Sequence, residues 1–402
     1  MFVTSAPGKV IIFGEHSAVY NKPAIAAAAS SLRSYLLIEN ENIDTNTLQL
    51  KFPNLKFEYQ WSIDKLSTIK HTHSLDSNTL SESLLQTIDT ELLPDITNPL
   101  HRSAAQCFLY LYLSIIPSDK RSSLKCTLIS TLPVGAGLGS SASVSVVLSQ
   151  AFLKLTQVNI SQNLINQWAF VGETVMHGTP SGIDNTIATY GGALQFIKDD
   201  SENTKELLPK KPIVAILTYT KIPRSTKTLV SNVRNLYESM PKIIEPILDS
   251  MAQIALLGAT ALQDANLKQV LDLVRINHGL LVSLGVSHPG LEIIRNLTTE
   301  LQVGETKLTG AGGGGCALTF LNDEATEDDV AQFRDTLHQK YNYQTFETTL
   351  GGIGCSLLDL NEIKNQNQVA SILDLFNSNE SSMEQIDNNL LPGGPADLPW
   401  MI

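Results

Sequence analysis

The second quarter of the chain shows two periods in its apolar positions, one typical of a strand and one typical of helices. Residues 124–132 carry apolar side chains near alternate positions, which predicts a strand that Pro133 ends. Residues 140–155 repeat apolar side chains at helical spacing, and similar patterns predict helices over about 102–115 and 161–178. The pattern therefore predicts mixed α and β structure in this region, with a strand that a short connection joins to a helix.

The rest of the chain divides at a change in composition. The polar segment 40–98 mixes short apolar runs with Ser, Thr, Asn and Asp, which predicts strands joined by surface loops. Charged residues and prolines accumulate over 198–212, just before a strand predicted at 213–219, and they indicate a domain boundary. We expect an N-terminal domain over 1–208 and a C-terminal α+β domain over 209–402.

Composition narrows the class of protein. With 402 residues, 43% of them hydrophobic, the chain can form two cores, and its net charge of −12 predicts no broad basic face for nucleic acid or an anionic membrane. The longest apolar stretch, 104–116, is too short to span a bilayer, and Lys9 within the first apolar run argues against a signal peptide. Cysteines without CxxC spacing suit a reducing cytosol and predict packing roles rather than a zinc site; they are Cys107, Cys126, Cys316 and Cys355.

The connection between the predicted strand and helix is a run of small residues, Pro133–Ala142 (PVGAGLGSSA). Glycines let backbone N–H groups approach an anion closely, and a helix start adds unpaired N–H groups and the positive end of the helix dipole. The run therefore predicts a cradle for a polyphosphate. It lacks the lysine of the Walker sequence, which excludes an ordinary P-loop NTPase. Ser141 is either a helix cap, the usual role of such a serine, or a magnesium ligand.

A second segment, Gly172–Asn185 (GETVMHGTPSGIDN), carries two carboxylates across a helix end. Glu173 is either a solvated helix residue or a ligand, and Asp184 either interacts with a helix dipole or has a chemical role. Beside a phosphate loop, one carboxylate together with Ser141 can hold magnesium, while the other orients or deprotonates an attacking hydroxyl. Lys9 would supply the cation that the loop lacks.

A third segment, Gly310–Gly315 (GAGGGG), satisfies the GxGxxG pattern of dinucleotide-binding folds. That pattern should open a helix, whereas residues 316–321 (CALTFL) read as a strand. The run therefore predicts a tight turn between two strands, whose backbone either approaches a ligand or a neighbouring segment or is simply a hairpin that needs positive φ angles.

These residues, in this order, resemble the GHMP superfamily of small-molecule kinases, which has three signature segments. The signatures are an early Pro-Gly-Lys stretch, a central PxGxGLGSSA loop and a late glycine-rich turn, found here at Ala6–Lys9, Pro133–Ala142 and Lys307–Cys316. The resemblance covers nearly the whole chain and narrows to the mevalonate kinases of eukaryotic type. The narrowing depends on Ser5–Tyr20, His177–Asn185, Thr220–Lys227, Ile276–Leu291 and Lys307–Cys316. Galactokinases share Gly14-Glu15-His16 but typically continue with Thr-Asp-Tyr, where this chain has Ser17-Ala18-Val19.

The resemblance implies a two-domain α+β GHMP kinase fold. Its N-terminal domain would be ribosomal-protein-S5-domain-2-like with a left-handed βαβ unit, and its C-terminal domain ferredoxin-like. The implied activity is ATP-dependent phosphorylation of mevalonate to 5-phosphomevalonate, in the route to isoprenoids and sterols. A cytoplasmic homodimer that farnesyl or geranyl diphosphates inhibit is implied as well, with no nucleic acid or membrane partner.

The resemblance also implies roles for individual residues. Asp184 would accept the proton of the substrate hydroxyl with Lys9 beside it, and Ser141 and Glu173 would hold Mg²⁺. The residues implied to bind ATP are Lys9, Asn54, Ser130, Gly135, Ala136, Gly137, Leu138, Gly139, Ser140 and Ser141. The residues implied to form the substrate wall are Glu15, His16, Thr226 and Ala311, with His16 as a partner for the mevalonate hydroxyl or carboxylate.

Three other functions stay open at this point. The nearest is a kinase of the same superfamily that acts on phosphomevalonate or a sugar. A ligand sensor built on a kinase scaffold is the second, although intact Lys9, Glu173 and Asp184 count against it. A dehydrogenase is the third, and it depends on the weak GxGxxG match alone.

Overall fold

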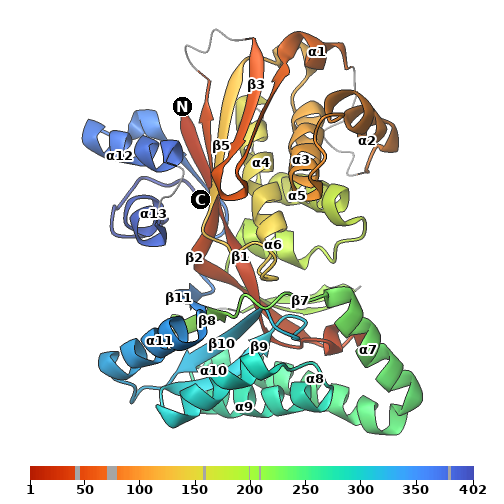
Figure 1. Cartoon of the computed structure of the whole chain (residues 1–402), viewed down its shortest axis with the longest axis vertical. Coiled ribbons are helices and arrows are strands. Elements are labelled where there is room, and N and C mark those ends of the chain that lie inside the picture. The colour runs from red at the N-terminus through yellow and green to blue at the C-terminus, as the bar shows by residue number, and fades with distance from the viewer. Residues whose placement is uncertain (41–45, 70–78, 157–159, 199, 208–209, 379–381) are drawn as a thin grey trace.

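One mixed sheet runs through the whole molecule, as the computed structural model shows (Figure 1). The structure describes residues 1–40, 46–69, 79–156, 160–198, 200–207, 210–378 and 382–402. The strands are β1 (Phe2–Phe13), β2 (Ala24–Glu39), β3 (Thr47–Phe52), β4 (Phe57–Ser62), β5 (Leu124–Ser130), β6 (Ala193–Ile197), β7 (Asp200–Leu207), β8 (Ile213–Tyr219), β9 (Gly304–Thr309), β10 (Cys316–Leu321), β11 (Gln344–Leu350) and β12 (Ser356–Asp359). The helices are α1 (Ile63–Thr68), α2 (Glu82–Thr87), α3 (Pro99–Ile115), α4 (Ser140–Thr156), α5 (Gln162–His177), α6 (Ile183–Tyr190), α7 (Thr226–Ser239), α8 (Pro241–Gln263), α9 (Leu267–Ser283), α10 (Pro289–Glu300), α11 (Glu327–Tyr341), α12 (Gln366–Asn377) and α13 (Met383–Leu390).

The long strand β2 joins the two halves of the sheet. Its C-terminal part pairs antiparallel with β5, and its N-terminal part pairs with β6 and touches β11 at the Ala29–Leu350 pair. Beyond β5, strand β3 adds in parallel and β4 closes the edge as a hairpin. On the other side the order is β11, β8, β10 and β9, all antiparallel. Helices α8 to α11 cover this second half, and α3 to α5 cover the first (Figure 1).

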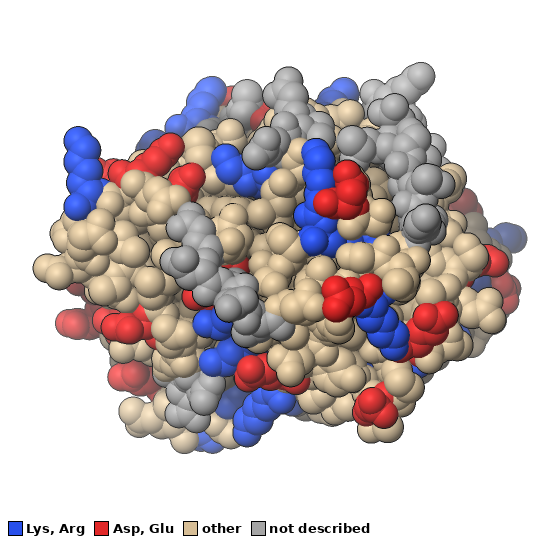
Figure 2. Space-filling model, turned by 90° about the horizontal axis from the view of Figure 1, so that it is seen from above, with Lys and Arg blue, Asp and Glu red and all other residues tan. Residues whose placement is uncertain are grey.

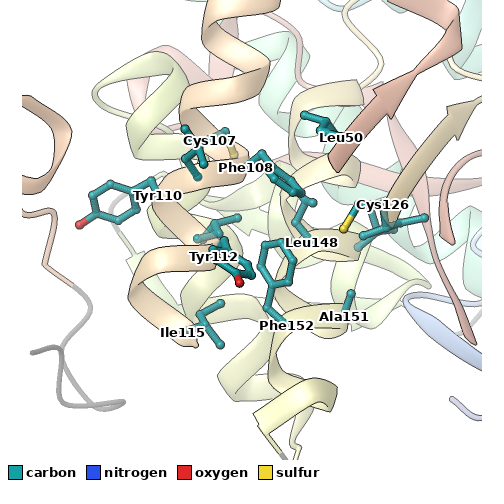
Figure 3. Packing of buried hydrophobic residues seen from close by; sticks show 14 of the residues in the cluster. Leu50, Cys107, Phe108, Tyr110, Tyr112, Ile115, Cys126, Leu148, Ala151 and Phe152 are labelled. Carbon is teal, nitrogen blue, oxygen red and sulfur yellow. The ribbon is translucent and has the colours of Figure 1, made fainter. Parts of the chain in front are cut away.

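The core of the first half lies between the sheet and helices α3 and α4. Asn98 caps α3 by accepting from the N–H groups of Leu100 and His101, and Pro99 occupies its first turn, where no backbone donor is needed. From α3, Phe108 and Tyr112 each meet the Phe152 ring of α4 edge-on, with centroids 5.6 and 5.5 Å apart (Figure 3). This packing fixes α4, whose first turn carries the phosphate loop's serines.

Helices α12 and α13 and the C-terminal tail cover the other face of the first half of the sheet. Their apolar side chains pack with Val3, Tyr35 and Leu358 of the sheet. Met401 exchanges two backbone hydrogen bonds with Leu357 of β12, both 2.8 Å, and the Trp400 ring lies 6.5 Å from that of Tyr35. The C-terminal tail is thus part of the fold.

The structure confirms most of the predicted elements and corrects two segments. The predicted strand at 213–219 is β8, and the predicted helices are α3, α4 and α5. The segment 40–98 holds the short helices α1 and α2 as well as strands, because its apolar residues join the same buried cluster as those of α3 and α4. The segment 198–212 contains strand β7, which pairs with β6. The proposed boundary at 208/209 lies outside the described residues, and the domain limits stay a prediction.

The apolar stretch 104–116 belongs to α3 and is buried, as predicted. Among the described residues, α8 is the one helix that is long and apolar enough to cross a membrane by length and composition. A core helix meets the same test, and α8 buries Met251, Ile254 and Ala255 against the second half of the sheet. We therefore interpret α8 as a core helix.

On the face shown in Figure 2, basic and acidic side chains are interspersed.

Candidate active site

A cleft of about 720 Å³ lies between the two halves of the molecule. Its walls come from β1 and the turn after it, from the loop between β5 and α4, from the ends of α5 and α6, and from the segments before α7 and after β9. The sequence-predicted residues on its walls are Lys9, Glu15, His16, Gly135, Gly137, Leu138, Gly139, Ser140, Ser141, Asp184, Thr226 and Ala311. The glycine loop, the early lysine and the late glycine turn therefore share one cavity.

Lys9 and Asp184 form an ion pair in this cleft, with 3.0 Å between Nζ and Oδ1. Lys9 is on β1, where its backbone N–H donates to the Leu138 carbonyl (2.8 Å) and so ties the strand to the phosphate loop. Asp184 is in the first turn of α6, just after Gly182 at φ 79°. Its side chain is 30% exposed and that of Lys9 is 11% exposed, so both groups can reach a ligand in the cleft.

The predicted phosphate loop, residues 133–142, contains three glycines at positive φ. They are Gly135 (75°), Gly137 (77°) and Gly139 (70°). Left-handed backbone of this kind favours glycine, because a side chain there adds strain. At Gly139 a Cβ would also lie 3.2 Å from Lys9 Cγ and 3.5 Å from Asp184 Oδ2. The loop then enters α4 at Ser140, which leaves the first N–H groups of that helix at the cleft.

Ser141 and Glu173 lie together at the side of the loop. Glu173, on α5, is only 4% exposed, so the interpretation of this residue as a solvated helix residue is wrong. Burial raises its pKa to about 7, and the Asp184 carboxylate adds to the rise, while the Ser141 hydroxyl and the Lys9 ammonium oppose it. The Ser141 hydroxyl also lies 3.0 Å from Nε2 of His177, the last residue of α5. It thus faces the side chains of α5.

This group of side chains fits a divalent cation. Glu173 and Asp184 bring two carboxylates against the single ammonium of Lys9, and Glu173 Oε1 is buried without a hydrogen-bond partner. A buried carboxylate oxygen of this kind needs a cation or a donor. Among the described residues there is no group of three His, Cys, Asp or Glu that could hold a metal alone. A cation bound by Ser141 and Glu173 would therefore complete its ligands with phosphate oxygens or water.

The residues predicted for the substrate wall all line the cleft, but their side chains differ in exposure. His16, at φ 61°, has Nε2 2.9 Å from the carbonyl oxygen of Ala311, and burial lowers the pKa of its imidazole. Thr226 is exposed at the start of α7. Glu15 is 1% exposed, and its carboxylate accepts from Lys307 Nζ and from Asn277 Nδ2 (3.2 Å), so its charge is neutralised within the protein.

Asn54 and Ser130, predicted to touch the nucleotide, hydrogen-bond to each other. Asn54 Nδ2 donates to the Ser130 carbonyl (3.1 Å), and the Ser130 N–H donates to Asn54 Oδ1 (2.8 Å). Neither residue is among those that line the cleft, whereas their neighbours Phe52 and Leu55 are. The pair connects the turn after β3 to the end of β5. Two further residues predicted for the site, Glu173 and Ala136, are also not among those that line the cleft.

Among the described residues that line the cleft, two with ionisable side chains were not predicted from the sequence. Arg224 donates to the Ala136 carbonyl in the phosphate loop (2.9 Å) and to the carbonyls of Thr309 (3.4 Å) and Gly312 (3.5 Å) at the late turn. It thereby links the two glycine segments and places a guanidinium on the wall. His177 is the other. Both residues lie in segments that carry the family resemblance, Thr220–Lys227 and His177–Asn185. The sequence therefore contained a signal for them, but the resemblance assigned them no role.

The glycine run Gly310–Gly315 joins β9 to β10, which confirms the predicted turn between two strands. Both interpretations of the turn hold, since five of its glycines have positive φ and its backbone lies against other segments. A Cβ at Gly314 would lie 2.8 Å from the Ile222 carbonyl, and one at Gly312 would lie 2.0 Å from that of Val286. Cys316, which follows, is fully buried with its pKa raised to about 12, so it has no character of a nucleophile.

Comparison with known proteins assigns this fold and site to a class. Residues 102–192 match the family model for the N-terminal domain of GHMP kinases, and residues 259–342 match the model for their C-terminal domain. The first match contains the loop 133–142, Glu173 and Asp184, and the second contains the late glycine turn 310–315. Fold and site together define a GHMP kinase.

Two relatives identify the family within that class. The chain is 46% identical to the mevalonate kinase of Saccharomyces cerevisiae over 99% of both chains, and 34% identical to that of Homo sapiens over 84% of this chain and 90% of the human one. The chain belongs to the mevalonate kinase family.

Solved structures agree on the fold. The Methanococcus jannaschii mevalonate kinase matches with a TM-score of 0.68 at 21% identity, over 87% of this chain and 98% of that one. The L. major mevalonate kinase in complex with R-mevalonate matches with a TM-score of 0.65 at 25% identity, over 86% and 94% of the two chains.

Proposed function

We propose that this chain transfers the γ-phosphoryl group of ATP to the 5-hydroxyl of mevalonate and releases 5-phosphomevalonate and ADP, a step toward isoprenoids and sterols. The observation that carries this proposal is the Lys9–Asp184 ion pair, which stands in the same cleft as the Gly135–Ser141 loop. Family membership supports mevalonate as the acceptor and ATP as the donor.

The glycine loop would hold the phosphates. Its backbone can approach an anion closely, and the N-terminus of α4 adds N–H groups and a favourable dipole. The apolar end of the cleft, at Phe52, Leu55 and Leu100, suits a nucleobase. Arg224 and Lys9 bring positive charge to a chain whose net charge is −12, which an anionic substrate requires locally.

Asp184 would accept the proton of the 5-hydroxyl as that oxygen bonds to the γ-phosphorus and the bond to the β-phosphate oxygen breaks. Lys9 would hold the Asp184 carboxylate in its orientation, and it would offset the charge on the transferred phosphoryl group. Phosphoryl transfer of this kind depends mainly on positioning and charge neutralisation. The loop amides and Lys9 therefore contribute more to lowering the barrier than the proton acceptor does.

We propose Mg²⁺ as the cation, held by the Ser141 hydroxyl and the Glu173 carboxylate. When bound, it would neutralise charge on the phosphates that it shares with the loop. Glu173 has the unpartnered, buried oxygen that such a role requires. On the substrate side, His16, Thr226 and Ala311 would form the wall that mevalonate meets, while Lys307 keeps the Glu15 charge from repelling the mevalonate carboxylate.

Three properties stay predictions of the family resemblance. They are a cytoplasmic location, a homodimer, and inhibition by farnesyl or geranyl diphosphates, whose diphosphate would compete for the loop. Size-exclusion chromatography with light scattering tests the dimer, and the dependence of inhibition on ATP concentration tests the competition.

A panel of acceptors tests the proposed activity. The purified chain is given ATP and Mg²⁺ with R-mevalonate, phosphomevalonate or galactose, and ADP release is followed by a coupled assay. We expect release that depends on mevalonate and is at least about a hundredfold slower with the other acceptors, because a pocket built for one set of polar groups rejects analogues strongly. Preference for phosphomevalonate or galactose would overturn the proposal.

A further inference from the structure

His177 stands out as a cleft residue without a role in the proposed reaction. It is the last residue of α5 and is exposed, yet its Nε2 lies 3.0 Å from the hydroxyl oxygen of Ser141 on α4. Its backbone is held independently of its side chain, because α5 ends at Gly178 (φ 79°), whose N–H donates to the Thr174 carbonyl (2.8 Å). Packing and helix termination therefore do not account for where the imidazole lies.

The hydroxyl of Ser141 has one proton and two neighbouring groups that can accept it. These are the carboxylate of Glu173 and the imidazole nitrogen of His177. If the proton goes to Glu173, it occupies a carboxylate oxygen that a cation would need. If it goes to His177, both Glu173 oxygens and a lone pair of Ser141 remain for the cation.

We propose that His177 is a positioning residue that accepts the hydrogen bond of the Ser141 hydroxyl, so that Ser141 and Glu173 present oxygen lone pairs to the cation that accompanies ATP. This inference rests on the proposed function, because it concerns the same cation site. It requires the His177 tautomer that carries its proton on Nδ1. Partners that orient a metal's ligands in this way typically change metal affinity when they are removed.

The test measures ATP binding by calorimetry without mevalonate, with and without Mg²⁺, so that no turnover is involved. His177→Leu removes the acceptor, whereas His177→Gln keeps an amide oxygen at similar reach. His338→Leu is the matched control, since His338 is also exposed in the last turn of a helix, α11, and does not line the cleft. Thermal unfolding of each variant verifies that the fold is kept.

We expect His177→Leu to reduce the Mg²⁺-dependent gain in ATP affinity by on the order of tenfold, with unchanged ATP affinity in EDTA. His177→Gln should recover most of that gain, and His338→Leu should match the parent chain. The inference is overturned if His177→Leu keeps the full Mg²⁺ gain. It is equally overturned if ATP affinity falls by the same factor with and without Mg²⁺, because His177 would then only shape the nucleotide wall.

Ser141→Ala separates this inference from the proposed function. If Ser141→Ala also leaves the Mg²⁺ gain intact, the proposed cation site itself is wrong, and the role of His177 is lost with it. If Ser141→Ala abolishes the gain but His177→Leu does not, the cation site stands and only the role of His177 is refuted.

Discussion

Lys307 and Glu15 form an ion pair in which both side chains are fully buried. Glu15 follows β1 and Lys307 lies on β9, so the pair joins the segment after β1 to the second half of the sheet. Lys307 also donates to the Leu308 carbonyl (2.7 Å). Two residues further along β9, Thr309 Oγ1 donates to the Ile11 carbonyl (2.9 Å). One face of β9 is therefore attached, at positions two residues apart, to the segment after β1 and to β1 itself.

Removing one partner of this pair should destabilise the fold much more than removing both partners. Lys307→Met leaves the Glu15 carboxylate buried without its cation, and we expect a loss of about 3–5 kcal/mol in the free energy of unfolding. The double variant Glu15→Gln with Lys307→Met removes both charges and should be more stable than the single one. Urea unfolding checks this; a Lys307→Met variant as stable as the parent would contradict the assigned role.

Gly139→Ala should impair turnover more than Gly135→Ala does. Both glycines have φ near 70–75°, so each substitution incurs left-handed strain of about 1–2 kcal/mol. A Cβ at Gly139 meets Lys9 and Asp184, whereas nothing lies within 4 Å of one at Gly135. Steady-state kinetics should thus give a lower kcat for Gly139→Ala, with similar thermal stability for the two. Equal kcat values would refute the crowding argument.

Arg224→Gln should raise the KM for both substrates, because the guanidinium bonds to the phosphate loop and to the late glycine turn. Its removal loosens both walls and takes away a local positive charge. Lys227→Gln is the control, since Lys227 is exposed on α7 and does not line the cleft. An effect confined to one substrate, or equal in the control, would show that the link between the walls is unimportant.

Asp387 should make stability depend on pH below neutrality. Burial raises the pKa of its carboxyl from 3.8 to about 6, and Oδ1 has no hydrogen-bond partner. A carboxyl with a raised pKa stabilises the fold while it is protonated, so this contribution is present below pH 4 and is lost as the pH rises through about 6. Asp387→Asn should remove this part of the pH dependence of Tm. Parallel curves for variant and parent between pH 4 and 7 would contradict it.

The local pattern of apolar, proline and glycine residues was sufficient to predict the elements around the phosphate loop. Alternation, a proline stop and helical spacing predict β5 and α4, and the serine and glycine signals predict the limits of α5. The glycines of the loop could be predicted because their chemistry is local. The strand β7 could not, since its charged sequence lacks alternation and it depends on pairing with β6.

Contacts between distant segments were the part that sequence could not supply. The spacing of Glu173 along α5 suggested a solvated face, but burial by α4 and the loop decides its environment. Family resemblance placed Glu15 on the substrate wall, while the fold adds Lys307 from β9 as its partner. Arg224 and His177 gain their roles only from the segments that folding brings to them.

The most direct test of the account compares Asp184→Asn with the parent chain in a single turnover of ATP with mevalonate. Asparagine keeps the shape of the side chain but cannot accept the hydroxyl proton or pair as an anion with Lys9, 3.0 Å away. We predict that phosphomevalonate formation slows by on the order of 10²- to 10⁴-fold while ATP still binds. Formation at nearly the parent rate would contradict the claim that the Lys9–Asp184 pair is the reacting centre.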